Sequence, residues 1–304
     1  MTLFDDMVDA ANAVHGAHPG HRALHAKGTC CEGSFTATPD AAALSRAVHF
    51  SGAAVPATVR FSNASGRPDA PDGERDGRGM ATKLRLADGG STDVVAVSRR
   101  VFFVRTAEDF LDLLRARTPD AETGQPDPGK IGAFLADHPE SVAAAEESLS
   151  ALPIESYLLT TYYAIHAFRL MSAEGNPTLV RYRWEPDAAP ATISDGEAGT
   201  RSPDYLQLDL ATRLGAGPAA FTLHFQVAGV DDDPNDPTVA WPDDRQDIVA
   251  GRLVLTGVVA DQQAGCEALI FDPTRVVDGV ECSDDPILHA RSGAYGVSYS
   301  RRQA

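Results

Sequence analysis

Basic residues are scarce in this chain. It contains 26 Lys and Arg residues against 43 Asp and Glu among 304 residues, which gives a formal net charge of −17. Binding to a nucleic-acid backbone depends on clustered Lys and Arg, so this composition argues against nucleic acid as a partner. It argues equally against binding to an anionic membrane surface.

Long apolar runs and an export signal are also missing. No segment reaches the length that spans a bilayer, and Met1-Thr2-Leu3-Phe4-Asp5-Asp6 is acidic where a signal peptide begins with basic residues. Four cysteines are too few for a disulfide scaffold in a chain of this length. Cys30 and Cys31 are neighbours, which disfavours a bridge between them. We therefore expect a cytoplasmic protein whose cysteines are all reduced thiols.

Several familiar catalytic and metal-binding motifs are absent. The sequence has no phosphate-binding P-loop, no G-x-S-x-G nucleophile elbow and no C-x-x-C pair. Histidines recur between residues 15 and 25, beside Cys30 and Cys31, in a run that could form a zinc or non-haem iron site. Pro19-Gly20 breaks the helix that would bring these side chains onto one face. We therefore expect no metal site in this run.

The hydrophobic pattern changes its period along the chain. Forty-three per cent apolar residues are enough for a large core. Helical spacing predicts a helix over residues 4–15, and further helices at 40–49, at 107–115 and in the second part of 117–150. Period-two alternation or a short apolar run predicts strands. These strands are expected at residues 57–62, 81–86, 93–97, 101–104, 167–170, 178–184, 220–227 and 251–256.

About eight strands in two sets, separated by a helical insertion, predict an α+β fold. Short connections favour antiparallel pairing, and the lack of edge protection favours an eight-stranded antiparallel β-barrel with helical insertions. The sequence shows no internal repeat and no clean linker. We therefore expect residues 1–304 to form a single domain, with an N-terminal helix within 1–20 and the barrel and its helices in 21–304.

Two residues at opposite ends of the chain could share one iron site. His25 lies in His25-Ala-Lys-Gly, and an imidazole can accept and return a proton near neutral pH. Tyr295 follows Arg291 in an R-x-x-x-Y pattern, and Arg302 lies seven residues further on. An imidazole above a haem could move protons in a bound peroxide, and a phenolate below it could hold the iron. Taken alone, each residue would more often serve packing.

Five segments give this pairing its weight, because together they resemble the haem catalase superfamily. The match runs over residues 21–302, in order and with similar spacing, and is most like the small catalase-related peroxidases of that superfamily. These segments are His25-Ala-Lys-Gly28, Val59-Arg-Phe-Ser62, Arg75-Asp-Gly-Arg-Gly79, Val101-Phe-Phe-Val-Arg105, and the tail from Ser283 through Arg291 and Tyr295 to Arg302.

The resemblance implies a haem b group, buried beside the barrel, with a distal and a proximal side. His25 corresponds to the distal histidine, Ser62 to the serine that orients it, and Phe110 to an aromatic residue on the distal face of the haem. Tyr295 corresponds to the proximal iron ligand. A free phenol has a pKa of about 10, so Fe³⁺ and hydrogen bonds from Arg291 would have to favour the phenolate.

Further polar residues correspond to the groups that hold this site in place. His166 and Asp285 match the partners of Arg291. The remaining arginines match the guanidinium groups that neutralise the haem propionates, where paired hydrogen bonds favour Arg over Lys. These are Arg22, Arg60 and Arg302.

The implied activity is a haem-dependent peroxidase that reduces hydrogen peroxide or organic hydroperoxides with a small organic electron donor. Large catalases carry a distal asparagine shortly before the segment that matches residues 101–105, whereas Val97 or Ser98 stands there in this chain. Loss of one such donor typically costs about 2.7–4 kcal/mol of transition-state stabilisation. We therefore expect weak catalase activity.

Two alternative functions remain. The first is a fatty-acid hydroperoxide isomerase of the allene oxide synthase kind, which usually has threonine before the distal histidine, where this chain has Leu24. The second is a haem-binding or sensing module without turnover. The sequence names neither the electron donor nor the physiological peroxide, and it leaves a homo-oligomer open.

Overall fold

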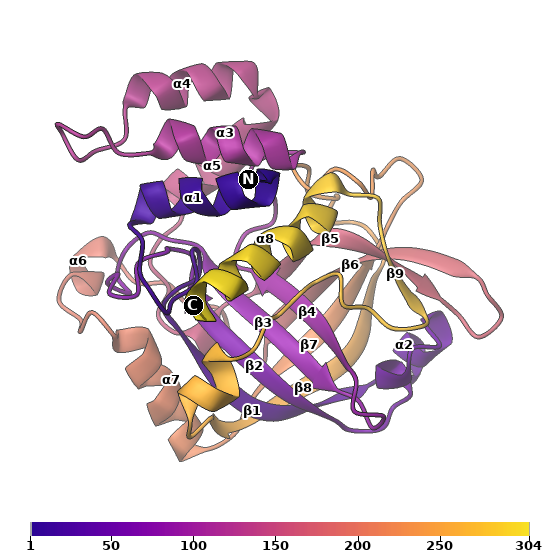
Figure 1. The fold of residues 1–304 in the computed structure, drawn as a ribbon. Helices are drawn as coiled ribbons and strands as arrows, with labels where there is room; N and C mark the ends of the chain where they lie inside the picture. The colour runs from indigo at the N-terminus through magenta and orange to yellow at the C-terminus, as the bar shows by residue number, and fades with distance from the viewer. Residues whose placement is uncertain (1, 304) are drawn as a thin grey trace.

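A closed β-barrel forms the centre of the molecule in the computed structural model, which describes residues 2–303 (Figure 1). The strand order is β4-β3-β2-β1-β8-β7-β6-β5, all neighbours are antiparallel, and β4 closes on β5 where Val97 pairs with Tyr163. The expected eight-stranded barrel is confirmed. Its strands are β1 Gly28–Ala37, β2 Val55–Asn63, β3 Arg78–Arg85, β4 Ser91–Val97, β5 Tyr162–Met171, β6 Pro177–Pro186, β7 Ala219–Val227 and β8 Asp247–Val258, with a short β9 Val280–Cys282 beside β5.

One predicted strand is wrong, and two strands, the barrel strand β1 and the short β9, were not predicted. Residues 101–104 form no strand, because Phe102 turns its N–H to the carbonyl of Pro237 in a loop. The missing eighth strand is β1, which pairs with both β2 and β8. Its sequence Gly-Thr-Cys-Cys-Glu-Gly-Ser alternates poorly, and a register shift between Glu32 and Gly33 interrupts its pairing with β8. Tertiary pairing therefore overrides a weak local signal.

Aromatic side chains fill the barrel interior. Phe35 contacts Trp184 edge to face, with ring centroids 5.9 Å apart, and Phe61 stacks on Tyr157 at 5.5 Å. These four side chains are fully buried, and each such burial contributes roughly 1.5–3 kcal/mol or more. The interior is a packed core, so reactive polar groups must gather outside the barrel.

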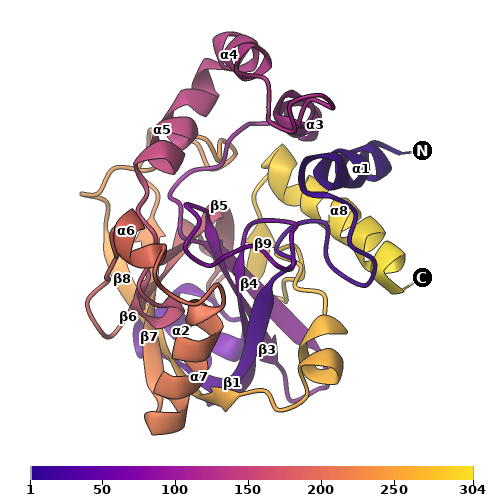
Figure 2. The same cartoon turned by 90° about the vertical axis from the view of Figure 1, so that its left-hand side faces the viewer.

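Helices from both ends of the chain lie side by side on the outside of the barrel (Figures 1 and 2). The side chain of Thr2 caps α1 (Leu3–His15), which packs against α3 (Ala107–Arg117) and α8 (Pro286–Gln303). The helix predicted over 40–49 is shorter, because Ser45 is extended after α2. The other helices are α2 Pro39–Leu44, α4 Pro128–Asp137, α5 Val142–Ser150, α6 Asp195–Ala198 and α7 Tyr205–Ala216.

The expectation of four reduced cysteines is wrong. Cys30 on β1 and Cys266 form a disulfide across 236 residues of sequence, with their Cα atoms 5.5 Å apart. The pairing of β1 with β8 brings the chain that follows β8 back to Cys30, a proximity that sequence spacing does not show. Cys31 and Cys282 remain free thiols, and burial raises their pKa to about 12 and about 11, so both stay protonated at neutral pH.

No helix among residues 2–303 combines the length and the apolar character that crossing a bilayer requires.

Candidate active site

His25 is held against Ser62 at the end of the barrel where β1 begins. The imidazole Nδ1 lies 3.0 Å from Ser62 Oγ. His25 has a positive φ of 56°, an uncommon conformation for a residue with a side chain. Its N–H donates to the carbonyl of Ala64 and its carbonyl accepts from Arg60 Nη1 at 2.9 Å. Hydrogen bonds to both the N–H and the carbonyl of His25 therefore hold this conformation.

Glycine at position 79 leaves the room that the His25–Ser62 pair needs. A Cβ atom at Gly79 would lie 2.7 Å from Ser62 Oγ and 3.0 Å from atoms of the His25 ring. Both contacts are too close for a side chain, so any larger residue on β3 would push the pair apart. The role of Gly79 follows from the pairing of β2 with β3, which sets Gly79 opposite Ser62.

The environment of His25 favours its neutral form. Burial is the main cause, and it lowers the pKa of His25 to about 4. The negative charge of Asp76 opposes this shift, whereas the positive charges of Arg60 and Arg291 add to it. At neutral pH the imidazole can therefore accept a proton.

Tyr295 and Arg291 lie one turn apart on α8 and contact each other. The Nε and Nη2 atoms of Arg291 donate to Tyr295 Oη at 2.8 Å and 2.6 Å. The helix explains the R-x-x-x-Y spacing, because residues four apart share one face. Two N–H donors of one guanidinium group therefore converge on the tyrosine oxygen.

His166 and Asp285 form a buried pair of their own. His166 Nδ1 lies 2.6 Å from Asp285 Oδ2, and Asp285 Oδ1 also accepts from the N–H of Ile287 at the start of α8. Among residues 2–303, the hydrogen bonds of the Arg291 side chain go to Tyr295, and neither His166 nor Asp285 forms one with it. The pKa of His166 is lowered from its usual value, mainly by burial. The hydrogen bond to Asp285 opposes this shift, and the charge of Arg291 adds to it.

The arginines expected at the propionates converge on one short segment after β8. Arg22 and Arg302 both donate to the carbonyl of Leu269 at 3.0 Å. Arg60 Nη2 lies 3.3 Å from Glu267 Oε1, and Arg22 Nη1 contacts the other oxygen of the same carboxylate. Residues from the start, the first quarter and the end of the chain thus meet here. No motif in the sequence singled out Glu267, because a lone glutamate carries no spacing signal.

An apolar cluster joins the neighbours of His25 and Tyr295. Leu24, Phe110 and Ala294 pack against one group of buried residues from α1, α3 and α8. Phe110 also lies 5.4 Å from Phe102, between ring centroids. The two ends of the chain that the sequence paired are therefore close in space, with Phe110 beside them.

Neither candidate for the missing distal amide offers a comparable donor. Ser98 accepts a hydrogen bond from the N–H of Arg78 at 2.9 Å, which ties its oxygen to β3, and its hydroxyl has a single O–H donor where a carboxamide has two N–H donors. Val97 pairs with Gly79 and Tyr163 at the seam of the barrel and carries only an apolar side chain.

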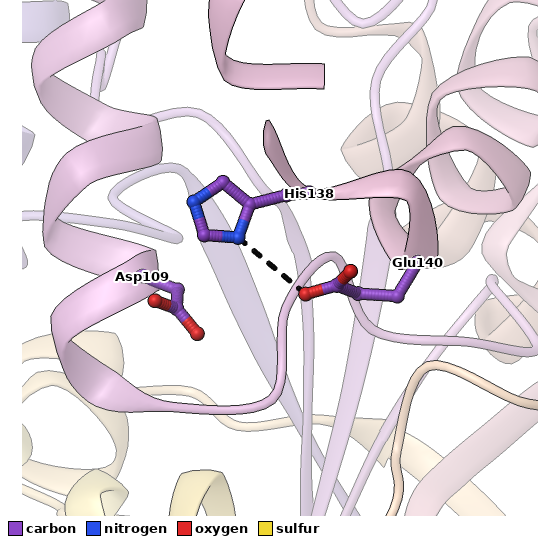
Figure 3. A group of neighbouring side chains, drawn as sticks. All are labelled: Asp109, His138 and Glu140. Atoms are coloured by element: carbon purple, nitrogen blue, oxygen red, sulfur yellow. Dashed lines mark hydrogen bonds and ion pairs between the residues drawn. The ribbon is translucent and has the colours of Figure 1, made fainter. Parts of the chain in front are cut away.

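One other group of potential metal ligands lies between α3 and the end of α4 (Figure 3). Asp109, His138 and Glu140 bring one ligand atom each to within 4.8 Å of one another. Each has a local explanation: Asp109 lies in the first turn of α3, His138 stacks on Phe134 and ends α4, and Glu140 lies 3.4 Å from His138 Nδ1. The histidines of the 15–25 run join no group of this kind among residues 2–303.

The fold is that of catalases. A bacterial catalase structure superposes with a TM-score of 0.84 at 26% identity, over 93% of this chain and 57% of that one. A fungal catalase gives a TM-score of 0.85 at 25% identity, over 93% of this chain and 59% of that one.

The sequence comparisons agree. The catalase family model matches residues 6–303, so the chain belongs to the catalase family. A catalase-related peroxidase of Mycolicibacterium paratuberculosis is 42% identical over 98% of this chain and 94% of that protein. One of Synechococcus elongatus is 35% identical over 98% of this chain and 88% of that protein. The expected family, and with it an oxidoreductase of the catalase-related type, is confirmed.

Proposed function

We propose that this protein is a haem b peroxidase that reduces hydrogen peroxide or an organic hydroperoxide with a small organic electron donor. The observation that carries this proposal is a surplus of positive charge beside His25. Three guanidinium groups lie around Glu267: Arg22 and Arg60 contact its carboxylate, and Arg302 donates to its main-chain carbonyl. Three positive charges less one negative leave two uncompensated, which equals the number of propionate groups on haem b.

The surroundings of the three arginines support an anion beside them. The pKa of Arg22 is lowered to about 9, mainly by burial and next by the charge of Arg60, against the opposing charge of Glu267. Burial also lowers the pKa of Arg60 and of Arg302. The Nε atoms of both Arg60 and Arg302 are buried without a hydrogen-bond partner among the described residues. Carboxylates at this position would supply both the missing charge and the missing acceptors.

Bound haem would supply a ferric centre that accepts electrons from the donor and passes them to the peroxide, and the protein would control protons and charge around it. Tyr295 would hold the iron, with Arg291 donating two hydrogen bonds to the phenolate oxygen. Ser62 would fix the His25 ring through Nδ1, which leaves Nε2 free to take a proton from one peroxide oxygen and return it to the other. Phe110 would cover the distal side.

The reaction with peroxide should keep its rate to an unusually acidic pH. His25 acts only when it is neutral, and its pKa is lowered to about 4, so activity should fall as the pH drops through about 4 rather than through 6.5. Stopped-flow measurement of the peroxide reaction from pH 3.5 to 8 tests this, with the haem absorption band recorded to exclude unfolding. A half-maximal rate near pH 6.5 would contradict the lowered pKa, because it is the value expected of an unshifted imidazole base.

Peroxidase turnover should exceed the disproportionation of peroxide. The distal amide of large catalases has no counterpart at Val97 or Ser98, and such a donor is typically worth about 10²–10³ in rate. Oxygen release and oxidation of a dye such as ABTS, measured per haem beside a large catalase, test this. Equal rates of oxygen release from the two proteins would refute it.

Three further expectations remain proposals. We propose a cytoplasmic location, although the Cys30–Cys266 disulfide is of a kind that is rare in that compartment. We also propose that residues 1–304 form one domain, because α1 packs on α3 and α8. We propose, third, that the protein forms a homo-oligomer.

A further inference from the structure

Glu267 bridges two arginines that come from distant parts of the chain. It is the last residue of the short helix η4 (Gln263–Glu267), which follows β8. One carboxylate oxygen contacts Arg22 Nη1, and the other lies 3.3 Å from Arg60 Nη2. The side chains of Arg22 and Arg60 are only 11% and 3% exposed, so solvent screens these contacts little.

The main chain around Glu267 holds the same arginines and a third. Arg22 Nη2 donates to the carbonyls of Cys266 and Leu269, at 3.4 Å and 3.0 Å. Arg302 Nη2 donates to the carbonyls of Glu267 and Leu269, also at 3.4 Å and 3.0 Å. The segment 266–269 is therefore a common anchor for the three guanidinium groups.

This segment is itself fixed to the barrel. The disulfide of Cys266 ends on Cys30, and Cys30 lies directly opposite Arg60 in the pairing of β1 with β2. The Gln262 side chain accepts from the N–H of Cys30 at 2.8 Å and donates to its carbonyl at 3.0 Å. Glu267 is thus held at a defined place beside Arg60 by contacts within the chain.

We propose that Glu267 is a positioning residue, which holds Arg22 and Arg60 side by side so that the haem propionates meet guanidinium groups already in place. This inference rests on the proposed haem-dependent function. Two buried guanidinium groups repel each other, and a carboxylate between them removes that repulsion. Binding to arginines that are already ordered avoids the cost of ordering them when haem binds.

The test compares two porphyrins in the full chain, haem and haem dimethyl ester, whose esterified propionates carry no charge. The release of each from the loaded protein to an excess of apomyoglobin is measured. The Glu267→Gln variant should release haem about tenfold faster, because ordered charge-assisted hydrogen bonds to the propionates are weakened. Its release of the dimethyl ester should match that of the unaltered protein.

Each outcome for the variants either supports or overturns the positioning role of Glu267. Equal acceleration with both porphyrins would show a merely structural role and overturn the proposal. Unchanged or slower release of haem would also overturn it, because Glu267 would then only compete with the propionates. If Glu267→Gln fails to fold, Glu267→Asp should give the same selective acceleration, since the shorter side chain cannot bridge both arginines. Glu281→Gln, which breaks an exposed ion pair with Arg169, should change neither rate.

An unaltered protein that binds neither porphyrin would instead refute the haem-dependent function itself, and this inference with it.

Discussion

Replacing His25 by alanine should leave haem bound and slow the reaction with peroxide by about 10²–10⁴-fold, the usual contribution of a positioned acid–base group. His25 supplies the only imidazole that the described structure pairs with Ser62 at this site. Its backbone carbonyl accepts from Arg60 Nη1, and alanine keeps that carbonyl, so the arginine cluster should survive. The measurement is the second-order rate of the spectral change after mixing with hydrogen peroxide.

A peracid provides a second test of the same variant. A peracid has a better leaving group than hydrogen peroxide, so it should depend less on proton transfer by His25. His21→Ala is the matched control, because His21 is exposed and lies four residues away. A His25→Ala protein that reacts with hydrogen peroxide at the rate of the His21→Ala protein would refute the assignment. If the unaltered protein reacts with neither hydrogen peroxide nor the peracid, it is a haem-binding module without turnover.

Replacing Tyr295 by phenylalanine should weaken haem binding by more than about 100-fold. Loss of a residue that merely supports a metal ligand typically costs 10–100-fold in metal affinity, and loss of the ligand itself should exceed that. The variant also leaves Arg291 without the hydroxyl that accepts its two hydrogen bonds. Haem content after purification and haem release to apomyoglobin measure the effect.

Tyr299→Phe is the control for this substitution. Tyr299 lies one turn further along α8, and the guanidinium group of Arg302 rests over its ring at 4.7 Å. Phenylalanine keeps that ring, so haem binding should change little. If the two variants lose haem equally, the effect belongs to the packing of α8 and the iron ligand must be sought elsewhere. Normal haem content in Tyr295→Phe would also show that Tyr295 is not the iron ligand.

The barrel was predictable because most of its strands carry strong local signals. Strands such as β7 alternate apolar and polar residues, and the core side chains Phe221 and Phe225 fall on one face. The strand β1 was not predictable in this way, since Gly28, Gly33 and two adjacent cysteines blur the period. Its position is set by pairing with β2 and β8, and β8 is too distant in sequence to appear in the local pattern.

The candidate site likewise has residues that the sequence predicts and residues that only the folded structure reveals. His25, Tyr295 and the arginines came from a resemblance in several ordered segments, and α8 explains why Arg291 and Tyr295 are four residues apart. Glu267 and the Cys30–Cys266 bridge came from neither motif nor spacing. Both depend on how β8 returns the chain to β1, a contact across more than 200 residues that only the folded structure shows.

The crosslink between Cys30 and Cys266 also changes what a break in the chain would do. It closes most of the polypeptide into a covalent ring, and the N-terminal segment with His25 and the C-terminal helix with Tyr295 are two tails that leave this ring on either side of the bridge. A protease that nicks any exposed loop within the ring would open it without releasing either tail. Both halves of the proposed iron site would stay on one covalent molecule.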